Sequence, residues 1–241
     1  MFSLDGKFFR GLMKIGDFLI LGVLGVFFAL PVVTLGASVT AMFYTGMKLT
    51  KDEESYVFKD FWRSFKMNLR QGFVIELIIA AAAFILISNI NVCLQWGDAE
   101  GGLVPVLFVY ATFGLLLIVA GVALYAFPLL AKFSDTVFNT IKNGLLLCTK
   151  HFAQTFVMLL ITGVIGYFTF TMPPIMILTI PFVCYVDSFI MARVLAPYIK
   201  QSEEAAAKAL EEEEAKEAAA AEEAAAIEAE KLAKIMGRES E

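Results

Sequence analysis

The sequence is poor in cysteine and histidine, the residues that build disulfide frameworks and many metal sites. Its 241 residues include one histidine, His151, and three cysteines, Cys93, Cys148 and Cys184. The cysteines are odd in number, far apart and without a CxxC pair, so the sequence predicts no disulfide framework and no metal site. His151 follows Lys150 at the edge of an apolar segment. We interpret it as an interfacial basic residue rather than a ligand or a catalytic base.

Motifs of the common enzyme classes are also missing from the sequence. There is no GxSxG, no HExxH, no P-loop motif and no pair of carboxylates at a useful spacing. We therefore expect a protein that is not an enzyme and needs no cofactor. Nucleic acid is not expected among its partners.

Long apolar stretches are what the sequence has in abundance. Hydrophobic residues make up 59% of the chain, 23 residues are phenylalanine, and the mean hydropathy is +0.74. Five stretches approach the ~20 residues needed to cross a bilayer, namely residues 18–35, 73–94, 103–130, 156–172 and 175–192. No soluble core could hide five such segments, so the sequence predicts an integral membrane protein.

The first apolar stretch is too long for a single crossing. As one helix, residues 17–49 would extend ~50 Å, whereas the hydrocarbon core is ~30 Å thick. Pro31 and Gly36 offer a break, so we predict a span over residues 17–30, a short corner, and a second helix over residues 37–49. The second helix is only ~20 Å long, and it forms either a full span or one arm of a re-entrant hairpin.

A stripe of small residues lies on the second of these helices. Ala37, Ala41 and Thr45 are four residues apart and therefore share one face. Small side chains at this spacing let helices approach closely within lipid, so we interpret the stripe as a packing seam rather than a pore lining. Association of the chain into a homo-oligomer stays open.

The distribution of lysine and arginine sets the expected orientation in the membrane. Residues 48–70 contain six basic side chains and residues 132–150 contain three. The connection at 95–102 contains acidic but no basic residues, and the turn at 171–174 has no charged residue. Because cytoplasmic loops carry the basic excess, we expect both basic segments and both termini to be cytoplasmic. The predicted fold is an all-α, polytopic transmembrane helix bundle with five to six spans.

The basic segment at 56–70 is predicted to form an amphipathic interfacial helix. Five apolar residues at offsets of 0, 3, 4, 7 and 11 make one helical face: Phe58, Phe61, Trp62, Phe65 and Leu69. Basic residues, Lys66 among them, occupy other positions. Such a helix can lie in the headgroup layer with its aromatic face toward lipid, or it can present the same surface to a partner protein. A second cytoplasmic amphipathic helix is expected within residues 133–148.

Three ionisable residues fall inside apolar segments, where they are costly and therefore informative. Arg193 is near enough to a membrane edge to extend its side chain there, and Glu76 is expected to reach toward Arg70 or Lys66. Asp187 is then the deep intramembrane carboxylate. Its spacing of six residues from Arg193 argues against a pair on one helix face. We expect an interhelical hydrogen bond for Asp187, with proton or ion transport as the alternative.

The end of the chain differs sharply in composition from the rest. Residues 201–241 consist largely of Ala, Glu and Lys, with 13 acidic and 5 basic side chains, so their net charge is −8 and that of residues 1–200 is +3. Ser202 can cap a helix, and Glu204 and Lys208 form one of several favourable i,i+4 pairs. We predict a transmembrane domain over residues 1–200, followed by a cytoplasmic tail that is a solvated helix rather than a coiled coil.

Three short motifs, in this order and spacing, resemble the YesL family of bacterial integral membrane proteins. They are Leu30-Pro-Val-Val-Thr-Leu-Gly-Ala-Ser-Val-Thr-Ala41, Phe61-Trp-Arg-Ser-Phe-Lys-Met-Asn68, and Phe127-Pro128 with Phe133. The resemblance covers residues 1–200 and implies a Gram-positive-type cytoplasmic membrane protein of undefined activity, commonly associated with carbohydrate uptake systems. It supplies no catalytic residue, and the tail from Ser202 onward departs from the family's pattern.

The sequence is compatible with three functions. Our leading hypothesis is an accessory or regulatory subunit of an ABC-type carbohydrate importer, in which the face containing Phe61 and Phe65 contacts the permease subunits. The second is an independent small-solute transporter or channel with Asp187 as its polar anchor. The third is a passive membrane scaffold whose acidic tail recruits a basic soluble protein. The lipid bilayer is a partner in all three.

Overall fold

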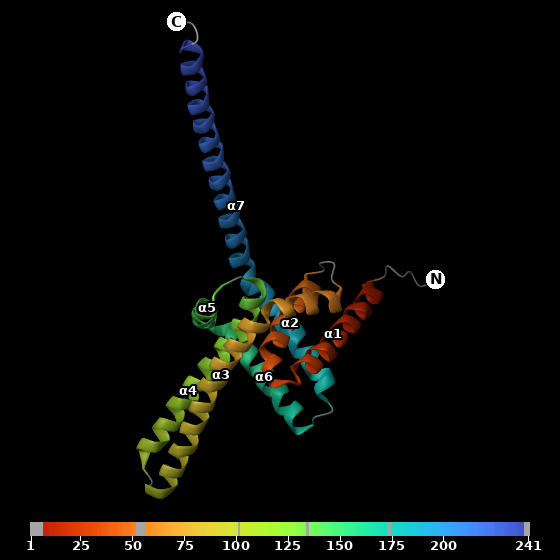
Figure 1. Cartoon of the computed structure of the whole chain (residues 1–241). Helices are drawn as coiled ribbons and strands as arrows, with labels where there is room; N and C mark the ends of the chain where they lie inside the picture. Colours follow the sequence, from red (N-terminus) through yellow and green to blue (C-terminus); the bar gives the residue numbers. More distant parts are fainter. Residues whose placement is uncertain (1–6, 52–55, 101, 134, 173–174, 239–241) are drawn as a thin grey trace, which may run out of the picture. The chain divides into compact units, whose positions relative to one another are not determined.

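The computed structural model describes residues 7–51, 56–100, 102–133, 135–172 and 175–238, and every regular element in these ranges is helical (Figure 1). The elements are α1 (Lys7–Ala29), the short 3₁₀ helix η1 (Val32–Thr34), α2 (Leu35–Thr50), α3 (Val57–Glu100), α4 (Leu103–Lys132), α5 (Val137–Lys150), α6 (Phe152–Thr171) and α7 (Met176–Arg238). The predicted all-α architecture is therefore confirmed.

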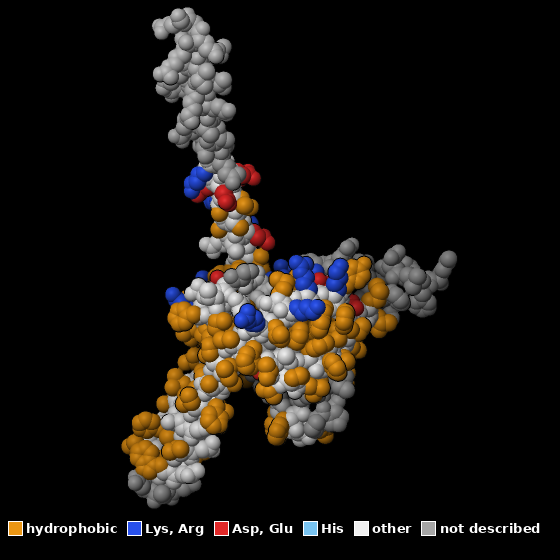
Figure 2. Space-filling view, in the orientation of Figure 1, with side chains coloured by type: hydrophobic (Ala, Val, Ile, Leu, Met, Phe, Trp, Pro, Cys, Tyr) orange, Lys and Arg blue, Asp and Glu red, His pale blue; other side chains and the backbone are white. Residues whose placement is uncertain are grey.

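Five helices in the described part of the chain are long and apolar enough to cross a membrane. The stretches concerned are Leu12–Ala29, Val57–Gly97, Leu103–Lys132, Phe152–Thr171 and Leu178–Lys216. Most of their side chains are not buried inside the protein, so apolar groups form its outer surface, as expected of helices that face lipid. In Figure 2, hydrophobic side chains cover much of this surface below a band of Lys and Arg side chains. The chain is a multi-pass membrane protein.

The break predicted at Pro31 is present. α1 ends at Ala29, and α2 begins at Leu35 after the single turn of η1. The Thr34 hydroxyl lies 2.6 Å from the carbonyl oxygen of Phe28 and 2.8 Å from that of Pro31, so it ties the last turn of α1 to the corner. With 16 residues, α2 is ~24 Å long, shorter than the hydrocarbon core.

Other helices enclose α2. Eleven of its 16 residues are buried, and the small residues Ala37, Ala41 and Thr45 are among them. α2 contacts α1, α3 and α4, and the Ser38 hydroxyl donates a hydrogen bond to the Gly25 carbonyl of α1 at 2.7 Å. Because protein rather than lipid surrounds most of α2, its short length leaves few of its groups facing the membrane.

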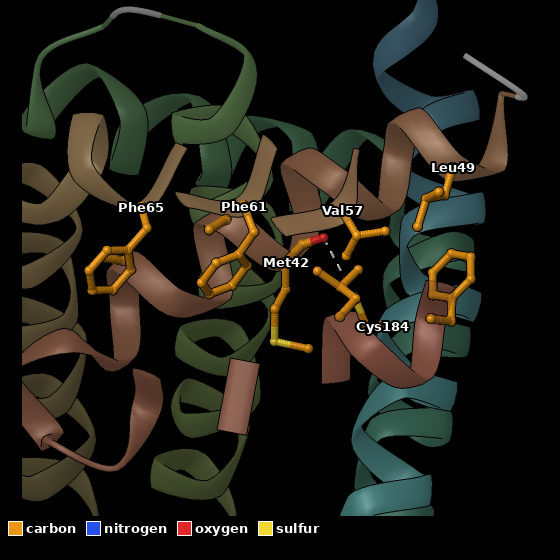
Figure 3. Packing of buried hydrophobic residues seen from close by; sticks show 10 residues of the cluster. Met42, Leu49, Val57, Phe61, Phe65 and Cys184 are labelled. Carbon is orange, nitrogen blue, oxygen red and sulfur yellow. Dashed lines mark hydrogen bonds between the residues drawn. The ribbon is translucent and has the colours of Figure 1, made fainter. Parts of the chain in front are cut away.

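The N-terminal part of α3 runs antiparallel to α2. Lys48 Nζ lies 2.9 Å from Asp60 Oδ2 at one end of this pair, and Gly36 packs on the backbone of Gly72 at the other. The amphipathic helix predicted at 56–70 is not a separate element, because α3 continues as one helix of 44 residues. In Figure 3 the ribbon of this part of α3 runs across the view, whereas the ribbon of α7 (teal) runs from top to bottom.

Beyond Gly72, α3 lies beside α4 (Figure 1). A hydrogen bond joins the two helices, because Asn89 Oδ1 in α3 accepts from Thr112 Oγ1 in α4 at 3.1 Å. The same oxygen accepts from Cys93 Sγ within α3 at 3.5 Å. Gly102, the residue before α4, has a φ of 105°, in the left-handed region that glycine adopts most easily. Many side chains at this end of the pair are apolar and exposed.

The second predicted amphipathic helix corresponds to α5. Thr136 caps its start, because its hydroxyl oxygen accepts a hydrogen bond from the Asn139 N–H at 3.4 Å, and the helix packs on α4. Residue 101 of the predicted acidic connection and residues 173–174 of the predicted uncharged turn lie outside the described residues.

The chain divides into two compact units within α7, one ending at Val194 and the other beginning at Leu195. The boundary that we predicted from composition at residue 200 falls inside the second unit. The described part of that unit is helical, and residues 201–216 are all exposed. Its ion pair between Lys200 Nζ and Glu204 Oε1 spans 3.7 Å at the surface, so it contributes little to stability.

Candidate functional site

Asp187 is a buried carboxyl group with one satisfied and one unsatisfied oxygen. Its side chain projects from the apolar part of α7 and is 1% exposed. Oδ2 accepts a hydrogen bond from the Thr162 hydroxyl of α6 at 3.1 Å, which is the interhelical bond expected from the sequence. Oδ1 is buried and has no hydrogen-bond partner. An unsatisfied carboxyl oxygen in an apolar interior is costly, so this group calls for a functional explanation.

A partly open cavity of about 680 Å³ lies against Asp187. Its walls come from four helices of the first unit, and the residues that line it are Val39, Met42, Phe43, Leu124, Thr162, Ile165, Gly166, Thr169, Phe170, Thr179, Ile180, Val183, Cys184 and Asp187. The volume is within the range of small-molecule sites. The cavity could therefore accommodate a small organic solute.

Few polar groups interrupt the apolar lining. Thr162 is already bonded to Asp187, and the hydroxyls of Thr169 in α6 and Thr179 in α7 lie 2.8 Å apart. A few polar groups in an apolar pocket are the usual arrangement for fixing the orientation of a bound solute. Asp187 carries the one carboxyl group among these lining residues, and most of the other lining residues are apolar.

The crossing of α2 and α7 forms the wall next to Asp187. Cys184 Sγ lies 3.7 Å from the Met42 carbonyl oxygen, the contact drawn as a dashed line in Figure 3. A Cβ atom added to Gly46 would collide with the Ser188 hydroxyl, so the two helices touch closely here. This crossing holds Asp187 in position, because Cys184, one turn away on α7, is fixed against α2.

The other two ionisable residues singled out from the sequence are separate from the cavity. The guanidinium carbon of Arg193 lies 4.1 Å from the ring centroid of Phe189, a cation–π contact within α7. Glu76 does not reach toward Arg70 or Lys66 as we expected. Its Oε2 accepts a hydrogen bond from the Gly36 N–H at 2.9 Å, because the start of α2 offers an unpaired donor beside α3.

The aromatic face predicted to contact lipid or a partner is in part a core surface. Phe61 is 0% and Phe65 is 7% exposed, and their ring centroids lie 5.6 Å and 5.1 Å from that of Phe28 in α1. Figure 3 shows Phe61 and Phe65 pointing to the same side of α3. The expectation that these two residues form a docking surface is corrected, because α1 already covers them.

The rest of the predicted aromatic face stays accessible. Phe58 is 60% exposed, Leu69 is also exposed, and Trp62 is partly buried. The Phe58 and Trp62 rings are stacked with centroids 6.5 Å apart, and Lys66 Nζ lies 4.7 Å from the centroid of the Trp62 ring. An outward strip of Phe58, Trp62, Lys66 and Leu69 is what remains for lipid or for a partner.

Metal-binding clusters do not occur in the described part of the chain. No group of three or more His, Cys, Asp or Glu side chains is placed there to hold an ion. Cys93, Cys148 and Cys184 are all buried free thiols.

Sequence reasoning identified Asp187 but missed the threonines around it. Thr162 and Thr169 are seven residues apart and therefore share a face of α6, and both line the cavity. Threonines at this spacing in an apolar span were the available signal. The spacing alone does not reveal which neighbouring helix the polar face meets.

Comparison with known proteins bears on the first part of the chain. Residues 18–90 match the model of a family described as "Protein of unknown function, DUF624". Comparisons with curated proteins and with solved structures gave no match. The matched range contains the corner at Pro31, α2 and the buried rings of Phe28, Phe61 and Phe65, whereas Thr162 and Asp187 lie beyond it. Over residues 18–90 the resemblance to the YesL family is confirmed: this part of the integral membrane protein matches DUF624, the family to which YesL-like proteins belong, whereas the motif of Phe127, Pro128 and Phe133 lies outside the match.

Proposed function

We propose that this protein is a small-solute transporter whose substrate site is the cavity beside Asp187. The observation that carries the proposal is the Asp187 Oδ1 atom, which is buried, lacks a hydrogen-bond partner and belongs to a residue lining a cavity of about 680 Å³. A solute that brings a cation or a hydrogen-bond donor to Oδ1 would satisfy it. The expected substrate class is a largely apolar molecule with one cationic or donating group.

A cationic group fits this site better than a neutral donor. A carboxylate inside a bilayer is costly by itself, and an opposite charge at close range in a low-dielectric surrounding reduces that cost. The apolar walls contribute affinity for a hydrocarbon body in proportion to the area buried. An anionic solute of the same shape would be rejected, because it would place like charges together.

The position of the cavity along the helices suggests its side of access. It is lined by the second half of α6 and the first part of α7, and so lies toward the connection between these helices, which we predict to be outside the cell. The basic start of α3 and the basic end of α4 are expected on the opposite, cytoplasmic side of the membrane. We therefore infer entry of the solute from the outer half of the membrane.

A series of matched probes tests binding. Hexyltrimethylammonium, hexylamine, hexanol and hexanoate share an alkyl chain and differ in charge, and each is added to the purified full chain while the unfolding temperature is followed by tryptophan fluorescence. We expect stabilisation by the two cations, less by the alcohol and none by the acid. Asp187→Asn should remove the preference for the cations, whereas Glu204→Gln, the same loss of charge at an exposed site, should keep it.

Flux measurements test transport itself. Hexyltrimethylammonium has a fixed charge and leaks slowly through lipid, so its uptake into proteoliposomes reports on the protein. We expect uptake by the natural sequence and loss of uptake by Asp187→Asn.

Equal stabilisation by hexanol and by the cations, or an Asp187→Asn variant that still prefers the cations, would refute the site. Binding without flux would refute the transport assignment.

The leading hypothesis from the sequence, an accessory subunit of an ABC-type carbohydrate uptake system, is the second candidate. It is supported by the resemblance to the YesL family and by the α3–α4 pair, whose far end carries exposed apolar side chains such as Phe84 and Phe108. In this proposal permease helices rather than lipid cover that end. The buried Phe61 and Phe65 no longer take part in the contact.

Site-specific crosslinking separates this candidate from the transporter. A photoreactive residue at Phe84 should crosslink to permease subunits in cells grown on a complex carbohydrate, identified by mass spectrometry. The same residue at Phe168, an exposed phenylalanine on α6 that does not line the cavity, serves as the control. Crosslinks to lipid alone at both positions would count against the accessory role.

The orientation stays part of the proposal. Five candidate spans together with α2 as a sixth crossing would place both termini in the cytoplasm of a bacterial cell. A cysteine introduced at Ser202 should then resist a membrane-impermeant maleimide in intact cells and react after lysis, whereas one at Gly102 should react in both.

A further inference from the structure

A second cavity, of about 630 Å³, lies between α3 and α4 at the end of the helix pair where the basic residues gather. We propose that it binds the phosphate group of an anionic phospholipid. Arg70 of α3 and Lys132 of α4 line it, together with the amides of Gln71 and Asn68. The inference is independent of the transporter proposal, because none of these residues lines the Asp187 cavity.

The two basic residues come from different helices and face one hollow. Arg70 precedes Gly72, where α3 meets α2, and Lys132 is the last residue of α4. Lys132 Nζ lies 5.2 Å from the ring centroid of Tyr44, and this contact orients the Lys132 side chain. The Asn68 amide donates to the Ser64 carbonyl at 2.9 Å and lies 3.2 Å from the Ser64 hydroxyl, so Asn68 is fixed as part of the wall. No acidic side chain is among the described residues that line the cavity.

This set of donors suits a phosphate group. A guanidinium can present two parallel N–H groups to phosphate oxygens, and an ammonium adds a compact charge beside it. The exposed Gln71 amide supplies a further donor. Basic pockets between transmembrane helices at the cytoplasmic side are known to accept lipid headgroups.

The remaining lining explains why the phosphate should belong to a lipid. Met67, Leu130 and Phe133 form an apolar part of the same cavity. Lys132 ends the long apolar stretch of α4, which places the cavity at the boundary between hydrocarbon and water. The band of Lys and Arg side chains above the hydrophobic surface in Figure 2 marks the same kind of boundary. An amphiphile can thus place its phosphate on Arg70 and Lys132 and its glycerol and first methylenes on the apolar part.

The test measures lipid binding to the full chain. Purified protein in zwitterionic detergent is titrated with phosphatidylglycerol or phosphatidylcholine, and bound lipid is counted by native mass spectrometry. We expect preferential binding of phosphatidylglycerol. Changing Arg70→Gln together with Lys132→Gln should weaken it roughly thirty-fold, the ratio expected for two basic side chains at a lipid headgroup.

A matched double variant controls for overall charge. Lys59→Gln with Lys142→Gln removes the same charge from exposed positions outside the cavity and should leave phosphatidylglycerol binding unchanged. Equal losses in both double variants would overturn the site, since diffuse surface charge would explain them. Absence of any preference for phosphatidylglycerol would overturn it as well.

Two further measurements, on the single variant Arg70→Gln and with inorganic phosphate as competitor, complete the test of lipid binding. If the pocket variant fails to fold through loss of the Lys132–Tyr44 contact, Arg70→Gln alone should still weaken binding roughly five-fold, and an unchanged affinity would overturn the proposal. Inorganic phosphate distinguishes the source of the group. Failure of phosphate to compete supports a lipid ligand, whereas displacement of the lipid by millimolar phosphate would overturn the lipid assignment in favour of a soluble phosphate compound.

Discussion

The carboxylate of Glu76 in α3 accepts a hydrogen bond from the backbone N–H of Gly36 at 2.9 Å, in the first turn of α2. Thr34, the residue at the N-cap position of α2, makes no side-chain capping bond. A neighbouring helix therefore supplies the cap. A negative charge at a helix N-terminus is favourable both for the unpaired N–H group and for the helix dipole. An acidic residue inside an apolar span thus has a structural explanation.

Replacing Glu76 should loosen the start of α2. We expect Glu76→Ala to lower the free energy of unfolding by about 1.5–3 kcal/mol, the contribution of a hydrogen bond to a charged group, and Glu76→Gln to lower it by less because the amide oxygen still accepts. Denaturant unfolding in mild detergent measures both. Glu204→Ala, at an exposed site, should change nothing, and an equal effect of the two alanine variants would contradict the capping role.

The contact between Gly36 and Gly72 should not tolerate a methyl group. A Cβ atom at Gly72 would lie 2.9 Å from the Ala37 nitrogen, and one at Gly36 would collide with the Gly72 carbonyl oxygen. We expect Gly72→Ala to destabilise the protein by about 1–3 kcal/mol, as overpacking does. Gly114→Ala is the control, because nothing lies within 4 Å of its Cβ position. It should be neutral or stabilising by up to about 1 kcal/mol.

Two phenylalanines one turn apart on α3 should differ strongly in their effect on stability. Phe61 is 0% exposed against Phe28, whereas Phe58 is 60% exposed. We expect Phe61→Ala to cost about 3–5 kcal/mol through loss of buried contacts and the cavity left behind. Phe58→Ala should stay within about 0.5 kcal/mol, as surface substitutions usually do. Thermal unfolding in detergent compares them, and similar melting temperatures would show that the aromatic face is not a core surface.

Cys148 should react slowly with alkylating reagents. It lies in α5, which is not among the candidate spans, and burial raises the pKa of its thiol above the ordinary value, an effect that the hydrogen bond with Thr155 lowers only in part. Because the thiolate is the reactive form, a raised pKa lowers the reactive fraction at neutral pH and moves the increase in rate to more alkaline pH. Iodoacetamide labelling read by mass spectrometry should be slower at Cys148 than at a cysteine introduced at Ser202, and equal rates would contradict this.

Several features followed from local sequence because their causes are local. Pro31 cannot continue a helix hydrogen-bond ladder, so the corner after α1 could be predicted from that residue and its spacing. The five apolar stretches indicated a membrane protein because each is long enough to cross a bilayer by itself. The face shared by Phe58, Phe61 and Phe65 also followed from helical periodicity.

What covers that face did not follow, because lipid, a partner and another helix are all apolar surroundings for a phenylalanine. Only the packing of α3 on Phe28 of α1 showed that Phe61 and Phe65 are in the core. The predicted partners of Glu76, Arg70 and Lys66, were wrong for a similar reason. Its actual partner, Gly36, is 40 residues away in the chain, so local spacing could not reveal it.

For this protein the sequence determined the membrane location, the helical class, the corner at Pro31 and the presence of one deep carboxylate. The tertiary structure alone decided that Asp187 meets Thr162, that one of its oxygens stays unpaired beside a cavity, and that Arg70 and Lys132 line one hollow. Helix periodicity fixes which residues share a face, but within an apolar medium many pairings of such faces satisfy the same pattern. Close packing of small residues and a few buried hydrogen bonds select one of them.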